Sequence, residues 1–384
     1  MTEPITQLTA NDFEEAMDFF NLVFSVYAPH DFENMLPHVY RPTDEQMGYN
    51  YAIKTGGRIR AAVGMLPIAW QVGGVELRVA GIGGVSTHPK WRSHGFMKAL
   101  MNHCLGRMKE QGYHASWLGG QRQRYLYFGY ERCGSMNVFT VNKTNVRHCF
   151  KGEANLHLDP LVADDADRIA KAKALHDAQP VHCRRPLEDF HKHCVSWNCQ
   201  PLVAMDVDGR MVGYLVVNKK GNAIAELVAE TDDLALRMVH AWVANRTEDS
   251  VTIDVHPLWA GLARKLGGIC EDHRIVMSGN WRIFDWVTVA DALMKMRRAI
   301  GPMAEGRVVI GIDGYGAIEL SVDGEEAACI ASDAAHDLQC SPPAAMRLLF
   351  GPLRPSLVLP VPERAAPLES WCPLPLGWCR QDGV

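Results

Sequence analysis

The segment from Gly84 to Met97 holds the residues that are best suited to chemistry. It reads GVSTHPKWRSHGFM and combines a predicted strand that ends at Pro89, a short loop with Arg92 and Gly95, and the start of a long helix. The first turn of a helix has unpaired N–H groups and a partial positive charge. Glycine lets the backbone approach an anion closely, and arginine adds a fixed positive charge. The pattern suits a pyrophosphate, although a well-capped connection from strand to helix would look the same.

Two other phosphate-binding motifs do not explain the sequence. There is no GxxxxGK[ST] segment, which argues against a P-loop. Gly81, Gly83 and Gly84 resemble a dinucleotide fingerprint, but they lie inside the predicted strand and the helix begins about nine residues later, too far for a Rossmann turn. We interpret these glycines as a bulge or splay in the strand, which would leave backbone groups free to pair with an extended ligand.

The segment THPKWRSHGFMKAL resembles the cofactor loop of the GNAT acyltransferases, commonly Arg/Gln-x-x-Gly-x-Gly/Ala. A second segment, YLYFGYE from Tyr125 to Glu131, resembles the family's Tyr-x-x-x-Gly-Phe/Tyr. The distance from Arg92 to Tyr125 leaves room for one helix, which we expect over residues 93–111, and one strand. Met97 stands where many members have Gly or Ala, but the backbone N–H does the binding there. The resemblance implies a GNAT fold for residues 1–148.

The resemblance also implies the co-substrate and the residues that handle it. Acetyl-CoA would be the acyl donor. Tyr125 matches the family's catalytic tyrosine, and a phenol, whose ordinary pKa is about 10, suits protonation of a leaving thiolate. We interpret the neighbouring Tyr127 and Phe128 as packing residues. Backbone groups of Val85 and Thr87 would hold the pantetheine and polarise the thioester carbonyl. The implied cofactor-binding residues are Val85, Ser86, Thr87, Arg92, Ser93, His94, Gly95, Phe96 and Met97.

The predicted elements in the rest of the chain extend the resemblance. A second unit, residues 149–285, repeats strands, a hairpin and helices in a similar order but has no Arg-x-x-Gly loop. A third unit, residues 286–384, opens with the helix VTVADALMKMRRAIG and is similar to sterol carrier proteins. This plan is that of the Eis (enhanced intracellular survival) group. It implies an α+β fold with mixed sheets, in which tandem GNAT-like domains precede a sterol-carrier-like α/β domain.

The general base has no obvious candidate on the strands that usually carry it. VELRVAGIGGVST carries only Glu76, early in the strand, and HASWL carries no acid. In the Eis group the chain terminus reaches the active site, so the resemblance assigns this role to the terminal carboxylate, on Val384. Most chain termini are disordered and solvated, and relatives often end on an aromatic residue. The tail WCPLPLGWCRQDGV, however, is unusually apolar and rich in proline for a loose end.

Two polar clusters have competing interpretations. One segment is crowded with potential metal ligands, namely His182, Cys183, His191, His193, Cys194 and Cys199. Their spacing matches no standard zinc site, and buried reduced cysteines are common, so we predict no metal. The loop that borders the acceptor groove in GNAT folds holds His30, Asp31, Glu33 and His38. These side chains could bind a cationic substrate, but a solvated polar loop explains them equally well.

Composition limits the class of protein. A length of 384 residues favours two or three domains, and 47% hydrophobic with 22% charged residues is typical of globular proteins. A formal net charge of -5 gives no general attraction to nucleic acid or anionic membranes. No apolar run approaches the ~20 residues of a membrane span, and the N-terminus lacks the pattern of a signal peptide. Eleven cysteines without framework spacing fit reduced thiols, and we expect a cytoplasmic protein.

We therefore expect an acetyl-CoA-dependent N-acyltransferase that acts on a primary amine of a small molecule, polyamine-like or aminoglycoside-like. One alternative is acetylation of protein lysines or N-termini. Another is a non-catalytic, CoA-binding regulatory protein, against which the intact Tyr125 and the loop from Arg92 to Gly95 argue. Eis-like proteins form homo-oligomers, and the resemblance implies the same assembly, with neither nucleic acid nor membrane as a partner. The identity of the amine and the acyl length stay open.

Overall fold

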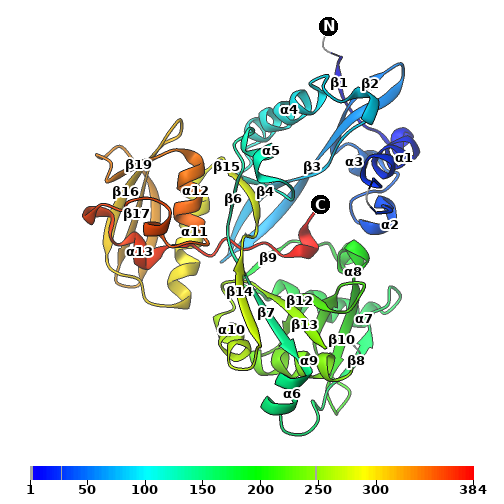
Figure 1. Cartoon of the computed structure of the whole chain (residues 1–384), viewed down its shortest axis with the longest axis vertical. Coiled ribbons are helices and arrows are strands. Elements are labelled where there is room, and N and C mark those ends of the chain that lie inside the picture. Colours follow the sequence, from blue (N-terminus) through cyan, green and yellow to red (C-terminus); the bar gives the residue numbers. More distant parts are fainter. Residues whose placement is uncertain (1–2, 27, 247–248) are drawn as a thin grey trace.

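Three β-sheets with helices packed against them make up the computed structural model, which describes residues 3–26, 28–246 and 249–384 (Figure 1). The first sheet follows the order β1–β2–β3–β4–β5–β15–β6, and β9 pairs with β3. The strands are β1 (Ile5–Gln7), β2 (Asn50–Thr55), β3 (Arg58–Val72), β4 (Val75–Thr87), β5 (Ala115–Leu118), β6 (Glu131–Cys133), β9 (Val181–Cys183) and β15 (Gly279–Ile283). Within this sheet β4 and β5 run parallel, whereas the other pairs are antiparallel.

The helices of the first sheet bury apolar faces that recur at helical spacing. They are α1 (Phe13–Phe24), α2 (Phe32–Met35), α3 (Asp44–Met47), α4 (Phe96–Glu110) and α5 (Arg122–Leu126). The buried side of α4 comprises Leu100, Met101, Cys104, Leu105 and Met108, which recur at helical spacing. The predicted start of this helix at Ser93 is wrong, because Ser93 (φ 67°) and Gly95 (φ 79°) are left-handed and delay the first helical turn to Phe96.

The second sheet follows the order β14–β7–β13–β12–β11–β10–β8. Its strands are β7 (Met136–Asn142), β8 (His157–Pro160), β10 (Gln200–Met205), β11 (Met211–Val217), β12 (Ala223–Ala229), β13 (Ser250–Val255) and β14 (Asp272–Val276). The accompanying helices are α6 (Lys143–Cys149), α7 (Ala166–Asp177), α8 (Leu187–Val195), α9 (Asp232–Ala244) and α10 (Ala260–Gly267). The central pair, β12 and β13, is parallel and is connected through α9, which is how α4 connects β4 to β5.

The third sheet is smaller and follows the order β18–β17–β16–β19. It contains β16 (Gly306–Ile312), β17 (Gly316–Asp323), β18 (Glu326–Ser332) and β19 (Leu338–Cys340), with α11 (Trp286–Ile300), α12 (Pro342–Phe350) and α13 (Leu368–Trp371) beside it. After α13 the chain leaves this unit and runs back between the first two sheets. The C-terminus therefore lies in the middle of the molecule in Figure 1, between the first and second units.

The sheets do not follow the expected boundaries after residues 148 and 285. Strand β7, residues 136–142, belongs to the second sheet, although the sequence places it in the first unit. Strand β15, residues 279–283, lies between β5 and β6 of the first sheet, although the sequence places it in the second unit. This exchange ties the two units together, because each sheet is completed by a strand that is distant in the sequence.

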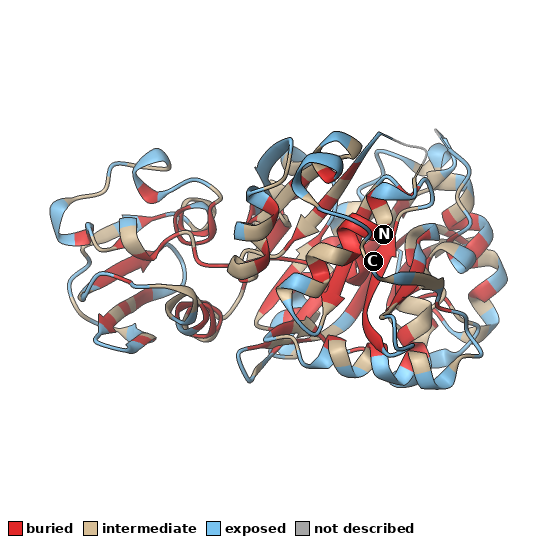
Figure 2. Ribbon diagram, turned by 90° about the horizontal axis from the view of Figure 1, so that it is seen from below, coloured by how far each residue is buried: buried red, intermediate tan, exposed pale blue. Residues whose placement is uncertain are grey.

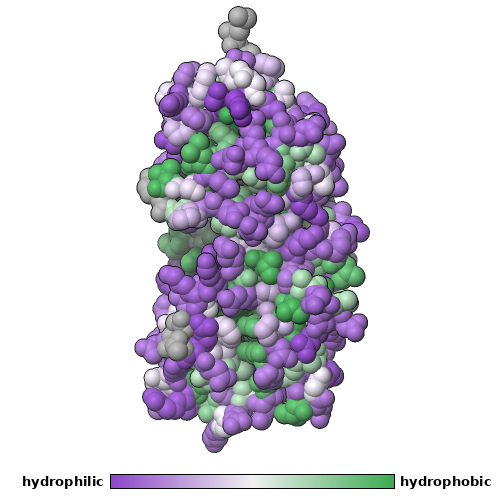
Figure 3. Space-filling view, turned by 90° about the vertical axis from the view of Figure 1, so that its right-hand side faces the viewer, coloured by the Kyte–Doolittle hydropathy of each residue, from purple (hydrophilic) through white to green (hydrophobic). Residues whose placement is uncertain are grey.

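Buried residues follow the strands and the inner faces of the helices (Figure 2). One core cluster joins the first sheet to the third unit and includes the indoles of Trp70, Trp281, Trp371 and Trp378. On the face shown in Figure 3 hydrophilic residues predominate, and the hydrophobic ones gather in small separate groups. None of the helices in the described part of the chain is long and apolar enough to span a membrane.

Polar contacts also connect the first unit to the second. Arg41 forms an ion pair with Asp189, with 2.7 Å between Nη2 and Oδ2. The rings of His38 and His193 lie with their centroids 3.8 Å apart, and Nδ1 of His38 is 2.9 Å from Oγ of Ser196. Burial, and to a lesser degree the positive charge of Arg185, lowers the pKa of His38 to about 4. His38 is therefore neutral at pH 7.

The contact at His38 predicts a loss of stability in acid. The ordinary histidine pKa is about 6.5, so between that pH and about 4 the unfolded chain binds more protons than the folded one, and stability falls as the pH falls. From pH 7 to pH 5 we expect His38 to contribute a loss of roughly 2 kcal/mol in the free energy of unfolding. His38→Gln should reduce the difference between urea unfolding curves at the two pH values by about this amount. The control His148→Gln, at an exposed histidine, should leave the difference in stability between pH 7 and pH 5 unaltered.

Candidate active site

A cleft of about 1080 Å³ opens where the end of β4 meets the start of α4. The cleft is lined by all nine residues that the sequence predicts to bind the cofactor, namely Val85, Ser86, Thr87, Arg92, Ser93, His94, Gly95, Phe96 and Met97. The charged side chains of the lining are those of Arg92, Lys98 and Arg124, and no acidic residue belongs to the described lining. The cleft is therefore electrostatically suited to an anion.

The loop that leads into α4 is held by its own side chains. Nδ1 of His88 accepts a hydrogen bond from the backbone N–H of Lys90. The ring of His94 lies against the backbone, with Nδ1 2.9 Å from the carbonyl oxygen of Arg92. Trp91 stacks on Phe96 at 6.0 Å between centroids. A helix start without a side-chain cap, at Gly95 in the left-handed conformation, leaves its first N–H groups available to an anion. This geometry could hold a pyrophosphate.

Strands β4 and β5 separate beside this loop. They pair from Val79 with Ala115 to Ile82 with Leu118, and beyond that point β4 continues alone along β3. A register shift in the pairing of β3 with β4 accompanies Gly84, which has a φ of 57°. The interpretation of the glycines as a bulge and splay is thus confirmed. The free side of β4 beyond Ile82 could pair with an extended ligand.

Tyr125 lies on α5, close to the cleft but not in its lining. Its side chain is only 7% exposed, and its ring meets that of Tyr130 edge to face. Burial raises the pKa of the phenol, and the positive charge of Arg124 offsets this in part, so the hydroxyl carries its proton at neutral pH. Phe128 is buried as expected. For Tyr127 the expectation is wrong, because its ring lines the cleft, is 64% exposed and lies 5.0 Å from Nζ of Lys98.

The C-terminal residue lies against the glycines of β4. A Cβ atom on Gly83 would be 2.9 Å from the carboxyl carbon of Val384. A Cβ atom on Gly81 would be 2.7 Å from Cγ2 of Val384. Only glycine leaves room for the chain end at these two positions. The indole of Trp197 donates a hydrogen bond to the carbonyl oxygen of Gly383 at 3.3 Å. The terminal carboxylate is thus brought to the strand whose next residues line the cationic cleft.

Two hollows flank Val384. One, of about 390 Å³, is lined by aromatic side chains, among them Trp117 and Trp197, and by Asp254 and Arg380. The other, of about 270 Å³, lies on the side of His38. Burial raises the pKa of Asp254, and the charge of Arg380 opposes this shift. Trp197 has a φ of 60°, a strained conformation for a residue with a side chain, and strain of this kind is often found at functional sites.

The polar loop of the first unit contributes only one residue to these hollows. His38 lines the smaller one, whereas the half-buried His30 and the exposed Asp31 and Glu33 do not belong to the lining of any described hollow. Asp31 instead caps α2, because its side chain accepts the backbone N–H of Asn34. The solvated interpretation therefore applies to Asp31 and Glu33, whereas the ring of His30 stacks on that of Phe32 with 5.6 Å between centroids.

The segment rich in histidine and cysteine serves packing and backbone contacts in several places. His182 contacts the carbonyl oxygen of Gln179, and His191 contacts that of Leu161. Cys183, Cys194 and Cys199 are buried. In the described part of the chain, no group of three or more His, Cys, Asp or Glu side chains is arranged to hold a metal ion.

Sequence reasoning missed Asp254 and Trp197 as parts of the site. Asp254 lies in the strand SVTIDV of the second unit, in which apolar and polar residues alternate. Nothing near it in the sequence distinguishes it from a solvent-exposed acid. Trp197 precedes Asn198 and follows a helix, where an aromatic residue usually packs. The alternating glycines at 81 and 83 were the usable signal, because glycine inside a strand often marks a close approach of another backbone.

Comparisons with known proteins agree with this geometry. Two family models described as acetyltransferase (GNAT) domains match residues 4–133 and residues 176–268. No curated protein matches the sequence.

Solved structures resemble the whole chain. A GCN5-related N-acetyltransferase from Kribbella flavida is 19% identical, with a TM-score of 0.68 over 100% of this chain and 98% of that one. A probable N-acyltransferase from Enterococcus faecalis V583, titled a conserved protein of unknown function, is 14% identical, with a TM-score of 0.68 over 98% of both chains. Eis1 from Mycobacterium abscessus is 15% identical, with a TM-score of 0.66 over 99% of this chain and 100% of that one. At these identities the likeness concerns the fold. The chain therefore has a mixed α/β fold that contains two GNAT acetyltransferase domains in tandem.

Proposed function

We propose that the protein is an acetyl-CoA-dependent N-acyltransferase that acetylates a primary amine of a small, polyamine-like or aminoglycoside-like molecule. The observation that carries the proposal is that β4 contacts both the cationic cleft and the chain end. Its residues Val85–Thr87 line a cationic cleft, and Gly81 and Gly83 of the same strand accommodate the C-terminal residue Val384. A cationic site for the anionic donor and a carboxylate thus lie along one strand.

The residues of the cationic cleft fit the acyl donor, which supplies a thioester. Arg92 and the first backbone N–H groups of α4, up to Met97, would hold the pyrophosphate. Val85 and Thr87, on the part of β4 that has no partner on its β5 side, would hold the pantetheine through their backbone groups. A backbone N–H at this position would also polarise the thioester carbonyl.

Tyr125 and Val384 complete the chemistry in this proposal. The amine nitrogen attacks the carbonyl carbon, and its proton passes to the carboxylate of Val384. The bond from carbon to sulfur breaks, and the leaving thiolate takes a proton from the phenol of Tyr125. Because burial keeps that phenol protonated, it can act as the acid at neutral pH.

The hollows beside Val384 favour a small acceptor over a protein. Their volumes of about 390 and 270 Å³ are those of small-molecule sites. The larger one places the carboxylate of Asp254 among the indoles of Trp117 and Trp197, a combination that suits a cation with an apolar body. Acetylation of protein lysines and non-catalytic CoA binding are the alternatives that the experiments below distinguish.

Three parts of the expectation stay predictions. The likeness of residues 286–384 to sterol carrier proteins rests on the sequence resemblance. The cytoplasmic location rests on composition and on reduced cysteines. The homo-oligomer rests on the assembly of Eis-like proteins. The division into domains at residues 148 and 285 is a further proposal, although the sheets themselves exchange strands across these positions.

Thiol release from acetyl-CoA with a panel of amines tests the proposal directly. Polyamines and aminoglycosides should drive turnover, and Tyr125→Phe should lower kcat about 100-fold or more, because the thiolate loses its proton donor. The dissociation constant of acetyl-CoA, measured by calorimetry, should not change. Tyr315→Phe, at an exposed tyrosine of the third unit, is the matched control and should keep the wild-type kcat. A wild-type rate in Tyr125→Phe with every amine would remove Tyr125 from the mechanism.

The terminal carboxylate can be tested without disturbing the donor site. Deletion of Val384 withdraws the carboxylate by about 3.5 Å, so kcat should fall about 100-fold while acetyl-CoA binding persists. Val384→Ala keeps the carboxylate in place and should retain most of the activity. Equal rates for the deletion and for Val384→Ala would show that the carboxylate is not the base.

The left-handed glycine at the start of α4 provides a test of the donor site. With a Cβ atom at position 95, the left-handed backbone conformation (φ 79°) costs about 1–2 kcal/mol of strain. A shift of the loop would relieve this strain and displace the N–H groups that face the ligand. We therefore expect the dissociation constant of CoA to rise about tenfold in Gly95→Ala. Gly106, inside α4, has no atom within 4 Å of an added Cβ. Gly106→Ala should leave the titration unchanged. Wild-type affinity in Gly95→Ala would argue against CoA binding at this loop.

A further inference from the structure

The second sheet has a cleft in the same place as the donor cleft of the first. Strands β12 and β13 pair only at Ala223 with Thr252 and at Ile224 with Ile253. Beyond these pairs each strand continues with its other neighbour, β12 along β11 and β13 along β7. The parallel strands therefore separate after two residues, as β4 and β5 separate after Ile82.

This second cleft is not built for a pyrophosphate. Only Glu230 and Thr231 connect β12 to α9, whereas residues 88–95 connect β4 to α4. Oγ1 of Thr231 already accepts the backbone N–H of Leu234, and Asp232 and Asp233 occupy the first turn. The helix start that binds anions in the first domain is thus capped and acidic in the second.

The chain's own C-terminal segment occupies the second cleft. A remaining cavity of about 80 Å³ is lined by residues 225–228 of β12, by Asp254 of β13, and by Gly377, Cys379 and Asp382 of the tail. The fit is close, because a Cβ atom on Gly377 would lie 2.3 Å from the ring of His256. Gln381 is fully buried, and its amide donates to the carbonyl oxygens of His193 and Cys194 at 3.0 and 3.1 Å.

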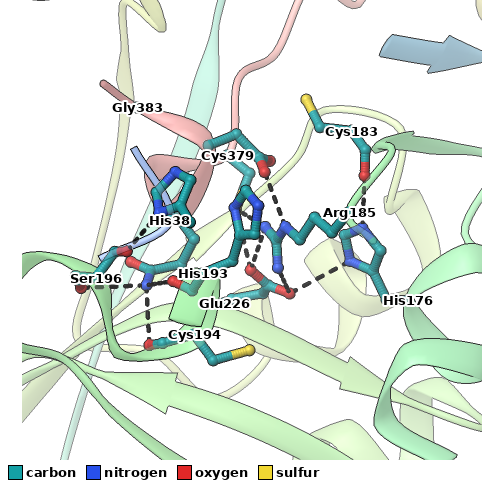
Figure 4. Close-up of polar contacts among 12 residues, drawn as sticks. His38, His176, Cys183, Arg185, His193, Cys194, Ser196, Glu226, Cys379 and Gly383 are labelled. Carbon is teal, nitrogen blue, oxygen red and sulfur yellow. Dashed lines mark hydrogen bonds and ion pairs between the residues drawn. The ribbon is translucent and has the colours of Figure 1, made fainter. Parts of the chain in front are cut away.

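A buried guanidinium fastens this segment. Arg185, with no exposed surface, donates from Nε to Oδ1 of Asp382 at 2.8 Å. Its other two nitrogens bind both carboxylate oxygens of Glu226 on β12, at 3.1 and 2.9 Å. Figure 4 shows Arg185 beside Glu226, and His176 contacts the same carboxylate. Arg185 is the second residue after β9, which pairs with β3 of the first sheet, so the charge lies where the two domains meet.

We propose that the second GNAT domain is a holder for the C-terminal tail, in which the cleft between β12 and β13, closed by Arg185, fixes Asp382 and thereby sets the carboxylate of Val384 against Gly83. Arg185 is a positioning residue, since it acts through the tail. Its effect on turnover rests on the proposed function of Val384, but the holding of the tail does not. The second domain accordingly binds no CoA.

Release of Val384 by a carboxypeptidase, followed by intact-mass measurement of the full-length protein, tests the holder directly. Asp382→Asn removes the charge that Arg185 binds, and Val384 should be released about tenfold faster or more than from the wild type. The control is Glu319→Gln, which makes the same change in an ion pair with Arg307 at the surface of the third unit. It should not alter the rate. If Asp382→Asn does not fold, Gln381→Ala carries the same test.

Kinetics separate this proposal from the function of Val384. If Val384 is released faster from Asp382→Asn, a lower kcat of this variant at an unchanged KM for acetyl-CoA supports both the holder and the role of Val384 as the base. Asp382→Glu should then recover part of the lost kcat. Faster release with an unchanged kcat supports the holder and removes Val384 as the base. Release at the wild-type rate from a folded Asp382→Asn variant overturns the holder. A calorimetric titration should find one CoA bound per chain. A second CoA site that persists in Gly95→Ala would also overturn the proposal that the second domain is a holder for the tail.

Discussion

One buried guanidinium, that of Arg185, carries the arrangement on which the rest of the site depends. Two buried carboxylates from distant parts of the chain, Glu226 on β12 and Asp382 in the tail, share its nitrogens. Taking these charges out of water is costly, and only close geometry with further hydrogen bonds offsets the cost. Tyr214 and His176 add contacts to Glu226. A cluster of this kind specifies one position for the tail, because any other position would leave the buried Nε of Arg185 without its acceptor.

The two GNAT domains use one framework for opposite electrostatic purposes. In both, a parallel strand pair separates beside a helix start. In the first, the loop from 88 to 95 opens the helix start at Gly95 and surrounds it with cations. In the second, the loop shrinks to Glu230 and Thr231, and acids follow. The same splay can therefore accept an anionic ligand in one domain and a segment of protein in the other.

Close approach of another segment to the backbone explains these glycines better than flexibility does. Gly81 and Gly83 leave room for Val384, and Gly377 leaves room for His256. Each contact joins segments that are far apart in the sequence. The tail, being apolar and rich in proline, loses little conformational entropy when it is placed between the domains. Exchange of β7 and β15 between the sheets gives that placement a rigid frame.

The sequence by itself determined what depends on local pattern. The anion loop, the apolar stripe of α4, the order of strands and helices, and the position of Tyr125 after β5 all follow from spacing within a few dozen residues. Only the tertiary structure decided that β7 and β15 exchange sheets, that Trp197 and Asp254 face the chain end, and that Arg185 meets Asp382. The physical reason is that these contacts join residues far apart in the chain, and a lone arginine or aspartate carries no local mark of the partner that will bury it.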